Sequence, residues 1–216
     1  MPTLQKDSNT MIRTTILALA FMAGLAPVLA AEQQEAAPAG LYKTDPSHSS
    51  LAWSFHHSGL SNYTARFIKV DARLDWKPAE PDGSRLSVQI DPMSVRTDYP
   101  WPEVVDFDKK IGGDEAFLAG KPITFVSQSI RVTGEKTGIV EGLLTLRGET
   151  HPATLDVTFN GSMAKHPIMG VPKIGFSATG HIRRSEWGLA FGIPALGDEV
   201  TLVIETQMVP ADHRFP

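Results

Sequence analysis

The stretch Gly40–Gly59 reads GLYKTDPSHSSLAWSFHHSG, and its second half alternates between apolar and polar side chains. This period of two predicts a β-strand with one buried face and one wetter face. The buried face would carry Leu51, Trp53, Phe55 and His57. Asp45-Pro46 favours a turn before the strand, and Ser58-Gly59 ends it. So large an apolar face has to be covered by strands that come later in the chain.

Seven further segments have the alternation or composition of strands, and turn residues separate them. They are residues 63–76, 86–90, 123–132, 139–147, 153–161, 174–182 and 200–206. The alternation is clearest in the first, where one face carries Ile68, Val70, Ala72, Leu74 and Trp76. We therefore predict an all-β fold, an eight-stranded antiparallel barrel, because closure removes exposed sheet edges and leaves room for one slender ligand.

Residues 93–122 interrupt the strand pattern, and we expect part of this long connection to be helical. Val104, Phe107 and Ile111 fall at helical spacing. Pro102 suits a first helical position, and a glycine pair after Ile111 would end the helix. The prediction is therefore a barrel with a short helical crossing.

The composition suits one globular domain with a sizeable core, since 42% of the 216 residues are hydrophobic and 20% are charged. The formal net charge of −4 gives no general attraction to nucleic acid or to an anionic membrane. The sequence contains no cysteine, which excludes disulfides, thiolate metal sites and a cysteine nucleophile. We therefore expect neither a nucleic-acid partner nor thiol chemistry.

The N-terminus has the layout of a secretory signal. Arg13 precedes an apolar run from Ile16 to Leu25, and Val28-Leu29-Ala30 supplies a small-residue cleavage pattern. An uncleaved membrane anchor is the alternative, although the run is shorter than the roughly 20 apolar residues of a spanning helix. The predicted organisation is a signal peptide (1–30, with Met11 as an alternative start), a flexible leader (31–40), the barrel (41–210) and a tail (211–216). We expect export, to the periplasm in a Gram-negative cell, and no membrane span in the mature protein.

The seven histidines raise the question of a metal site, but none of the usual zinc-ligand spacings occurs. His56 and His57 are neighbours on a strand, so they point to opposite faces and cannot share one ion. His57 is either a hydrogen-bonded core histidine or a polar group that faces a ligand. His151 is expected in an exposed proline turn, and Arg183-Arg184 with Glu186 in a solvated or ion-paired strand end. We assign no catalytic residue, no metal ligand and no cofactor.

Several segments form a series that covers the whole mature chain. They read Tyr42-Lys-Thr-Asp45 with His48-Ser49, Asp91-Pro-Met-Ser94-Val95-Arg96-Thr97, Phe117 with Pro122-Ile-Thr-Phe125-x-Ser127, Gly142-Leu-Leu-Thr-Leu-Arg-Gly148-Glu-Thr-His-Pro152, and Arg184-Ser-Glu-Trp187-Gly188 with Gly197-Asp-Glu199-Val200. In order and spacing they resemble the motifs of the YceI-like family, which are secreted, lipocalin-like, polyisoprenoid-binding proteins of bacteria. The segment 142–152 is the most specific match. The resemblance implies a lipocalin-like barrel.

The resemblance also implies a function: a non-catalytic periplasmic carrier of a long-chain isoprenoid lipid, of quinone or prenyl phosphate type, held in the barrel interior. Its partner would be that lipid or quinone, and a homodimer is a further form that the sequence permits. Two alternatives stay open. One is a periplasmic enzyme that uses His57 or His48 as a base, and the other is a barrel with a solid core that acts through its surface.

The ligand-binding residues that we expect are inward-facing aromatic side chains and one histidine, because a long apolar chain must be shielded from water. They are Trp53, Phe55, His57, Phe67, Phe125, Phe159 and Phe176. The aromatic residues would line the isoprenoid chain, and His57 would hydrogen-bond a quinone carbonyl or a prenyl phosphate. Phe67 departs from the alternation, since it would point away from the face that carries Ile68.

Overall fold

The computed structural model describes residues 35–215, so the predicted signal peptide at 1–30 lies outside the described residues. Within this range the chain forms strands and one α-helix, α1 (Phe107–Gly113). The strands are β1 (Gly40–Thr44), β2 (Ser50–His57), β3 (Ser61–Phe67), β4 (Val70–Trp76), β5 (Arg85–Ile90), β6 (Val95–Arg96), β7 (Ile123–Val132), β8 (Thr137–Leu146), β9 (Glu149–Met163), β10 (Lys173–Arg183) and β11 (Leu196–Pro210). Short 3-10 helices are η1 (Pro46–His48), η2 (Pro81–Gly83), η3 (Pro92–Ser94) and η4 (Arg184–Trp187). No helix of the described range is long and apolar enough to cross a membrane.

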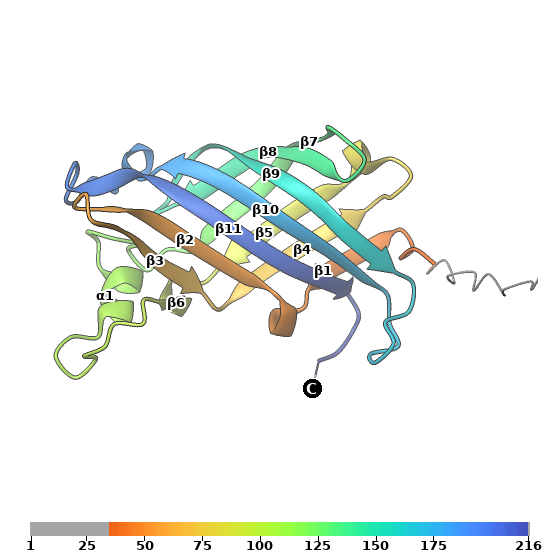
Figure 1. The fold of residues 1–216 in the computed structure, drawn as a ribbon, viewed down its shortest axis with the longest axis horizontal. Coiled ribbons are helices and arrows are strands. Elements are labelled where there is room, and N and C mark those ends of the chain that lie inside the picture. Colours follow the sequence, from red (N-terminus) through yellow and green to blue (C-terminus); the bar gives the residue numbers. More distant parts are fainter. Residues whose placement is uncertain (1–34, 216) are drawn as a thin grey trace, which may run out of the picture. The chain divides into compact units, whose positions relative to one another are not determined.

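The sheet closes on itself into a barrel (Figure 1). Neighbouring strands are antiparallel in the order β1-β4-β5-β7-β8-β9-β10-β11, and β1 pairs with β11 to complete a ring of eight. At one end, β2 pairs with β11, and β3 pairs with both β2 and β6. The predicted eight-stranded antiparallel barrel with a short helix is therefore confirmed.

The first three strands of the barrel are each interrupted. β1 gives way to β2 through η1, β4 follows β3 after a short kink, and β5 gives way to β6 through η3. Both 3-10 interruptions begin with Asp-Pro. The Oδ1 atom of Asp45 accepts the N–H of Ser47 at 3.0 Å, and Oδ1 of Asp91 accepts the N–H of Met93 at 2.9 Å. Each aspartate therefore caps a tight turn that ends its strand.

The kink between β3 and β4 changes which side chains face the interior. The N–H of Ile68 donates to the carbonyl of Ser94 at 3.1 Å, and the N–H of Lys69 donates to the Ser94 hydroxyl at 3.1 Å. The predicted inward position of Ile68 is wrong, because its side chain is 51% exposed while Phe67 is only 8% exposed. An irregularity in the strand, which resets the alternation, allows Phe67 and Val70 both to face inward.

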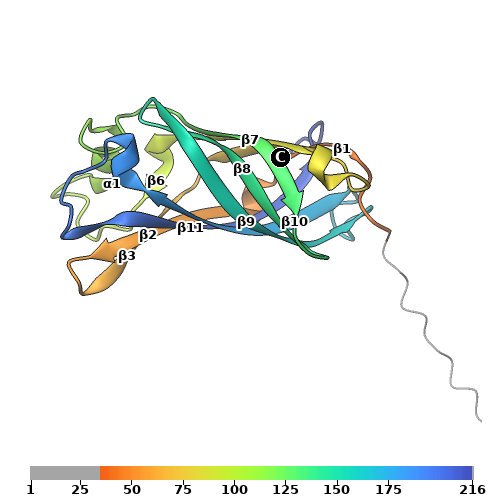
Figure 2. The same ribbon diagram turned by 90° about the horizontal axis from the view of Figure 1, so that it is seen from above.

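The helical crossing lies at one end of the barrel, close to β6 (Figures 1 and 2). α1 begins after Asp106, whose carboxylate accepts the N–H of Lys109 at 3.0 Å. The predicted helix starts too early, because residues 102–104 form a turn and Val104 is exposed. Phe107 and Ile111 are on the barrel-facing side of the helix, as the spacing predicts. The aspartate cap, rather than Pro102, sets the start of α1.

The turn between β8 and β9 is tighter than the sequence predicts. Arg147 and Gly148 form it with φ angles of 57° and 87°, and β9 begins directly afterwards at Glu149. This two-residue hairpin geometry places His151 within a strand. The prediction of an exposed turn position is therefore wrong, since His151 is half-buried with its ring centroid 5.1 Å from that of Trp187.

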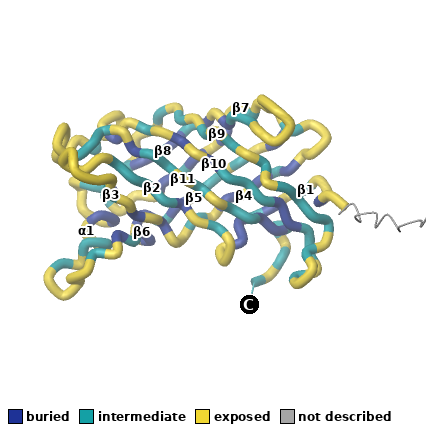
Figure 3. Tube along the Cα trace, in the orientation of Figure 1, coloured by how far each residue is buried: buried dark blue, intermediate teal, exposed yellow. Residues whose placement is uncertain are grey.

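The described part of the predicted flexible leader, residues 35–39, packs against the barrel. Ala164 donates its N–H to the carbonyl of Glu35 at 2.7 Å, and Ala37 donates its N–H to the Ser162 hydroxyl at 3.2 Å. Ala37 is also buried in a cluster with Tyr42 of β1. For these residues the leader is part of the fold. Figure 3 shows the wider pattern, in which buried positions lie along the strands and beside α1 while most loops are exposed.

Candidate functional site

The barrel interior contains two apolar cavities. The helix-end cavity, of about 420 Å³, lies beside α1 and is lined mainly from β2, β3, β11, α1 and the segment that follows η4. The far cavity, of about 390 Å³, is lined mainly from β4, β5, β8, β9 and β11, and Phe176 and Ala178 of β10 complete it. Leu51 is buried and lines both cavities. The interior therefore differs from the solid core that was one of the alternatives.

The aromatic face of β2 lines the helix-end cavity. Trp53 and Phe55 stack with ring centroids 6.0 Å apart and an interplanar angle of 9°, and Phe67 joins them from β3. Tyr63, which the sequence pattern did not single out, lies 5.6 Å from Phe55 between ring centroids. The β2–β3 register pairs these two residues, so both face inward. The Ser58-Gly59 hairpin signal was the available clue to this position.

His57 lies at the mouth of the helix-end cavity. It ends β2, is exposed, and has its ring centroid 6.4 Å from Phe55 and 6.3 Å from Tyr63. It is therefore not the buried core histidine that the alternation allowed. His56 points to the opposite face as predicted, with Nδ1 3.4 Å from the side-chain oxygen of Asn62. At the mouth, the ring nitrogens of His57 can donate or accept a hydrogen bond.

Phe159 and Phe176 line the far cavity rather than the helix-end cavity. Together with Trp76 they form a group whose ring centroids are 5.5 to 5.6 Å apart. Trp76 is a lining residue that the site prediction left out, although its strand alternation had placed it inward. In the described part of the chain, the indole N–H groups of Trp76 and Trp53 are both buried without a hydrogen-bond partner. The two cavities therefore each contain an indole with an unpaired donor.

Phe125 lines neither cavity. It is buried in the core on β7, where its ring crosses Gly142 of β8. A Cβ atom at Gly142 would lie 2.4 Å from the Phe125 ring, so only glycine fits at this crossing. Phe125 thus packs the barrel wall, and the ligand-binding role of the seven selected residues stays a prediction.

Residues of the crossing and of the segment after η4 complete the helix-end cavity, and among them only Phe107 had a signal in the sequence periodicity. Phe107 of α1 and Phe117 of the crossing line it from one side, and Leu189 and Phe191 line it from the segment after η4. Phe117 and Phe191 meet edge to face with centroids 5.5 Å apart. These residues are far apart in the sequence and come together only because the barrel closes, so a local pattern cannot identify them.

Arg184 is a buried cation in the wall of the helix-end cavity. It is 8% exposed, and its guanidinium carbon lies 5.7 Å from the ring centroid of Phe55. Burial lowers the pKa of Arg184, and the charge of Asp198 opposes this change. The predicted solvated or ion-paired strand end is therefore wrong for this residue, although Arg183 beside it is exposed. The sequence could not distinguish the two arginines, because the strand ends at this point and the alternation stops.

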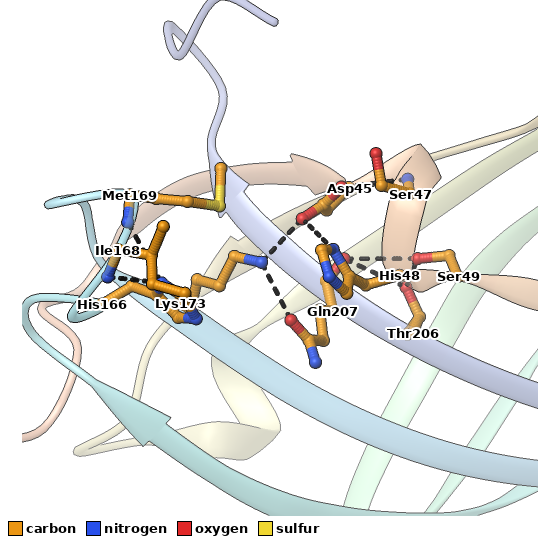
Figure 4. Close-up of polar contacts among 10 residues, drawn as sticks. All are labelled: Asp45, Ser47, His48, Ser49, His166, Ile168, Met169, Lys173, Thr206 and Gln207. Carbon is orange, nitrogen blue, oxygen red and sulfur yellow. Dashed lines mark hydrogen bonds and ion pairs between the residues drawn. The ribbon is translucent and has the colours of Figure 1, made fainter.

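A polar cluster centres on Asp45, which lines neither cavity (Figure 4). The carboxylate of Asp45 accepts hydrogen bonds from Lys173 at 2.7 Å and from the Ser47 N–H at 3.0 Å, and it contacts His48 Nδ1 at 2.9 Å. Burial raises the pKa of Asp45, but the bonds from Lys173, His48 and Ser47 outweigh it and hold the pKa below its ordinary value. His48 thus has a carboxylate that orients its ring, which the sequence had not revealed.

Comparison with known proteins gives consistent matches. The model of the YceI-like domain matches residues 42–208. A UPF0312 protein of Pseudomonas putida strain W619 is 35% identical over 184 residues, which cover 83% of this chain and 88% of that protein. These matches extend over nearly all of the barrel.

Two solved structures share the fold. BcnA of Burkholderia cenocepacia has a TM-score of 0.65 at 20% identity, covering 76% of this chain and 98% of that chain. A domain from Saccharophagus degradans, described as polyisoprenoid binding and implicated in plant cell wall breakdown, has a TM-score of 0.51 at 15% identity, covering 78% and 98%. At these identities the likeness shows the barrel fold alone.

Proposed function

Because this chain belongs to the YceI-like domain family, we propose that it carries a long-chain isoprenoid lipid inside its barrel. The ligand would be of quinone or prenyl phosphate type, and the protein would act in the periplasm without catalysing a reaction. The polyisoprenoid-binding description of the Saccharophagus degradans domain, which has the same fold, supports this ligand class.

The observation that carries the proposal is the pair of apolar cavities that share Leu51. One cavity of about 420 Å³ is within the usual range for a small-molecule site, and the second extends the apolar space along the barrel. A long flexible chain with few polar groups is the kind of molecule that uses such a space. Burial of its apolar surface contributes roughly 25 cal/mol per Å², from which the cost of ordering the chain is subtracted.

The lining of the helix-end cavity favours binding over acid–base catalysis. Its ionisable residues are His57, Tyr63, Lys110 and Arg184, and no carboxylate of the described chain lines it. A histidine base normally works with a group that orients it and with a nucleophile or water held nearby. His48, whose ring is oriented by the carboxylate of Asp45, lines neither cavity. The apolar site and the oriented histidine are therefore separate.

Lipid extraction followed by mass spectrometry of freshly purified protein tests the proposal. We expect an isoprenoid to co-purify, and the delipidated protein to bind geranylgeraniol with a change in tryptophan fluorescence, because Trp53 lines the cavity. Trp101, which is exposed in the crossing, contributes a background signal that Trp101→Phe removes. Protein that carries no lipid when fresh, and that binds neither geranylgeranyl phosphate nor a ubiquinone analogue after delipidation, would contradict the proposal.

A further inference from the structure

We propose that Arg184 binds the oxyanion of the ligand head group, so that the helix-end cavity selects an acidic amphiphile, a prenyl phosphate or carboxylate, over a neutral quinone or alcohol. The inference rests on the proposed function and deepens it, because it names the chemistry of the head group. Its basis is the hydrogen bonding, charge balance and position of one buried arginine.

The hydrogen bonds of Arg184 orient its guanidinium but do not neutralise it. Nε donates to the carbonyl of Gly197 at 2.8 Å, Nη2 donates to the carbonyl of Leu196 at 2.9 Å, and Nη1 donates to the carbonyl of Leu189. All these acceptors are neutral backbone groups. An arginine has five N–H donors, so these bonds leave some N–H groups of the guanidinium available for a further acceptor. A fixed guanidinium plane with free donors is the arrangement that phosphate and carboxylate recognition uses.

The charge of Arg184 has no direct counter-ion among residues 35–215. Arg66 and Arg96 are the arginines of this range that contact carboxylates, those of Asp98 and Asp108. Asp198 is the acid whose charge acts on Arg184, but its two oxygens are bonded by the N–H of Ser185 at 2.9 Å and the hydroxyl of Ser185 at 2.8 Å. A buried charge without a partner is unfavourable, and an incoming anion relieves this cost.

The position of Arg184 places a positive charge in the wall of the cavity. It lies over the ring of Phe55, inside a lining that is otherwise almost entirely apolar. Lys110 of α1, which is exposed, adds a second cation to the lining, and no carboxylate of the described chain lines the cavity with them. Apolar surroundings strengthen the attraction between opposite charges. An apolar chain with an acidic end therefore matches both properties of the site.

A purely structural role, in which Arg184 only ties the segment after η4 to the barrel, makes a different prediction. Removing a structural tether weakens the binding of all ligands alike. Removing an anion-binding group weakens only the acidic ligand. A comparison of ligands that share one chain and differ in head group therefore separates the two roles.

The experiment titrates delipidated protein with geranylgeranyl phosphate, geranylgeranoic acid and geranylgeraniol. We expect wild type to bind at least one of the acidic ligands about tenfold or more tightly than the alcohol, and the two acids distinguish phosphate from carboxylate. Arg184→Met should lose this preference while its affinity for the alcohol changes little. Arg183→Met is the matched control, since it removes the same charge from the exposed neighbour and should keep the preference.

The outcomes separate this inference from the proposed function. If wild type binds all the ligands equally, or if folded Arg184→Met keeps the preference, the assignment of Arg184 is wrong while the carrier function stands. If wild type binds none of them and no ubiquinone analogue, the carrier function itself fails. Thermal unfolding reports whether Arg184→Met folds. If that variant does not fold, the comparison of acid with alcohol in wild type still tests the inference.

Discussion

Asp45 connects three segments that are far apart in the sequence. Its carboxylate bonds the N–H of Ser47 in η1 and the Nζ of Lys173 on β10, and its own N–H donates to Gln207 of β11. Lys173 also bonds the side-chain oxygen of Gln207 at 2.9 Å. Asp45 is 1% exposed, so this ion pair is fully buried and every polar atom in it depends on its partners. It fixes the point where β1 turns into β2.

We predict that Asp45→Asn lowers the free energy of unfolding by about 3–5 kcal/mol, because it leaves the Lys173 ammonium buried without a counter-ion. Urea unfolding at neutral pH measures this loss. The double variant Asp45→Asn, Lys173→Met should lose less than the sum of the two single variants, since it removes both charges. Strict additivity would show that the two groups do not interact.

The same pair predicts a dependence of stability on acid pH. In the folded protein the pKa of Asp45 is lowered from its ordinary value of 3.8, so the folded state binds the proton less readily than the unfolded chain. The stability that Asp45 contributes is therefore present above about pH 4 and is lost as the pH falls below that value. The difference in unfolding free energy between wild type and Asp45→Asn should shrink as the pH falls from 5 to 3. A constant difference over this range would contradict the assignment.

The alternation of apolar and polar residues predicted some side-chain positions correctly and others wrongly. The alternation correctly placed Trp53, Phe55 and His57 on one face because a strand constrains every second residue. It misplaced Ile68 because the kink after β3 depends on the backbone and hydroxyl of Ser94, which belongs to η3. It could not reveal the burial of Arg184, because the carbonyls of Leu189 and Gly197 create that environment only once the segment after η4 folds back onto it.

At the level of elements, the barrel strands were predictable and the helical crossing was only partly so. Strand periodicity is a local property, and each of the predicted strands has a counterpart in the barrel. The interruptions of β1 and β5 carried a local signal as well, since both begin with Asp-Pro. The start of α1 was predicted too early. The Asp106 cap sets it, and the contact between Asp108 and Thr97, which holds the helix against the segment after β6, is not visible in the local pattern.

That contact joins α1 to the segment after β6. Oδ1 of Asp108 accepts the N–H of Thr97 at 2.7 Å and the Thr97 hydroxyl at 2.6 Å. We predict that Asp108→Ala lowers the free energy of unfolding by about 1.5–3 kcal/mol, the range for hydrogen bonds to a charged group. Hydrogen exchange should quicken across residues 97–113. Lys109→Ala, at an exposed neighbouring position, is the control and should leave exchange unchanged. Faster exchange in both variants, or in neither, would contradict this role of Asp108.

The barrel interior is enclosed by the molecule as a whole, and no single strand or helix could enclose it. Eight strands must close before either cavity exists, and Leu51 belongs to the lining of both. Under the proposed function, a short chain needs only one cavity, whereas a long chain would have to extend past Leu51 into both. We therefore expect the affinity for a ligand to depend most directly on the length of its chain.

Ala178 of β10 offers a way to fill the far cavity alone, since it is small, buried and part of that lining. Thr179 is its exposed neighbour on the outer face, so Thr179→Phe is a control of equal bulk. Ala178→Phe should leave the helix-end cavity open. The variant should therefore still bind short prenols and lose affinity for long ones. Circular dichroism and thermal unfolding establish that both variants are folded.

The most direct test is the affinity of geraniol, farnesol, geranylgeraniol and solanesol for wild type, Ala178→Phe and Thr179→Phe. For wild type and Thr179→Phe, affinity should rise by about tenfold or more with each isoprene unit that becomes buried, since each buried CH₂ contributes about 0.8 kcal/mol before ordering costs. For Ala178→Phe the rise should stop at a shorter chain. Affinities that do not depend on chain length in wild type, or an Ala178→Phe series that follows wild type throughout, would contradict an isoprenoid chain held along the barrel interior.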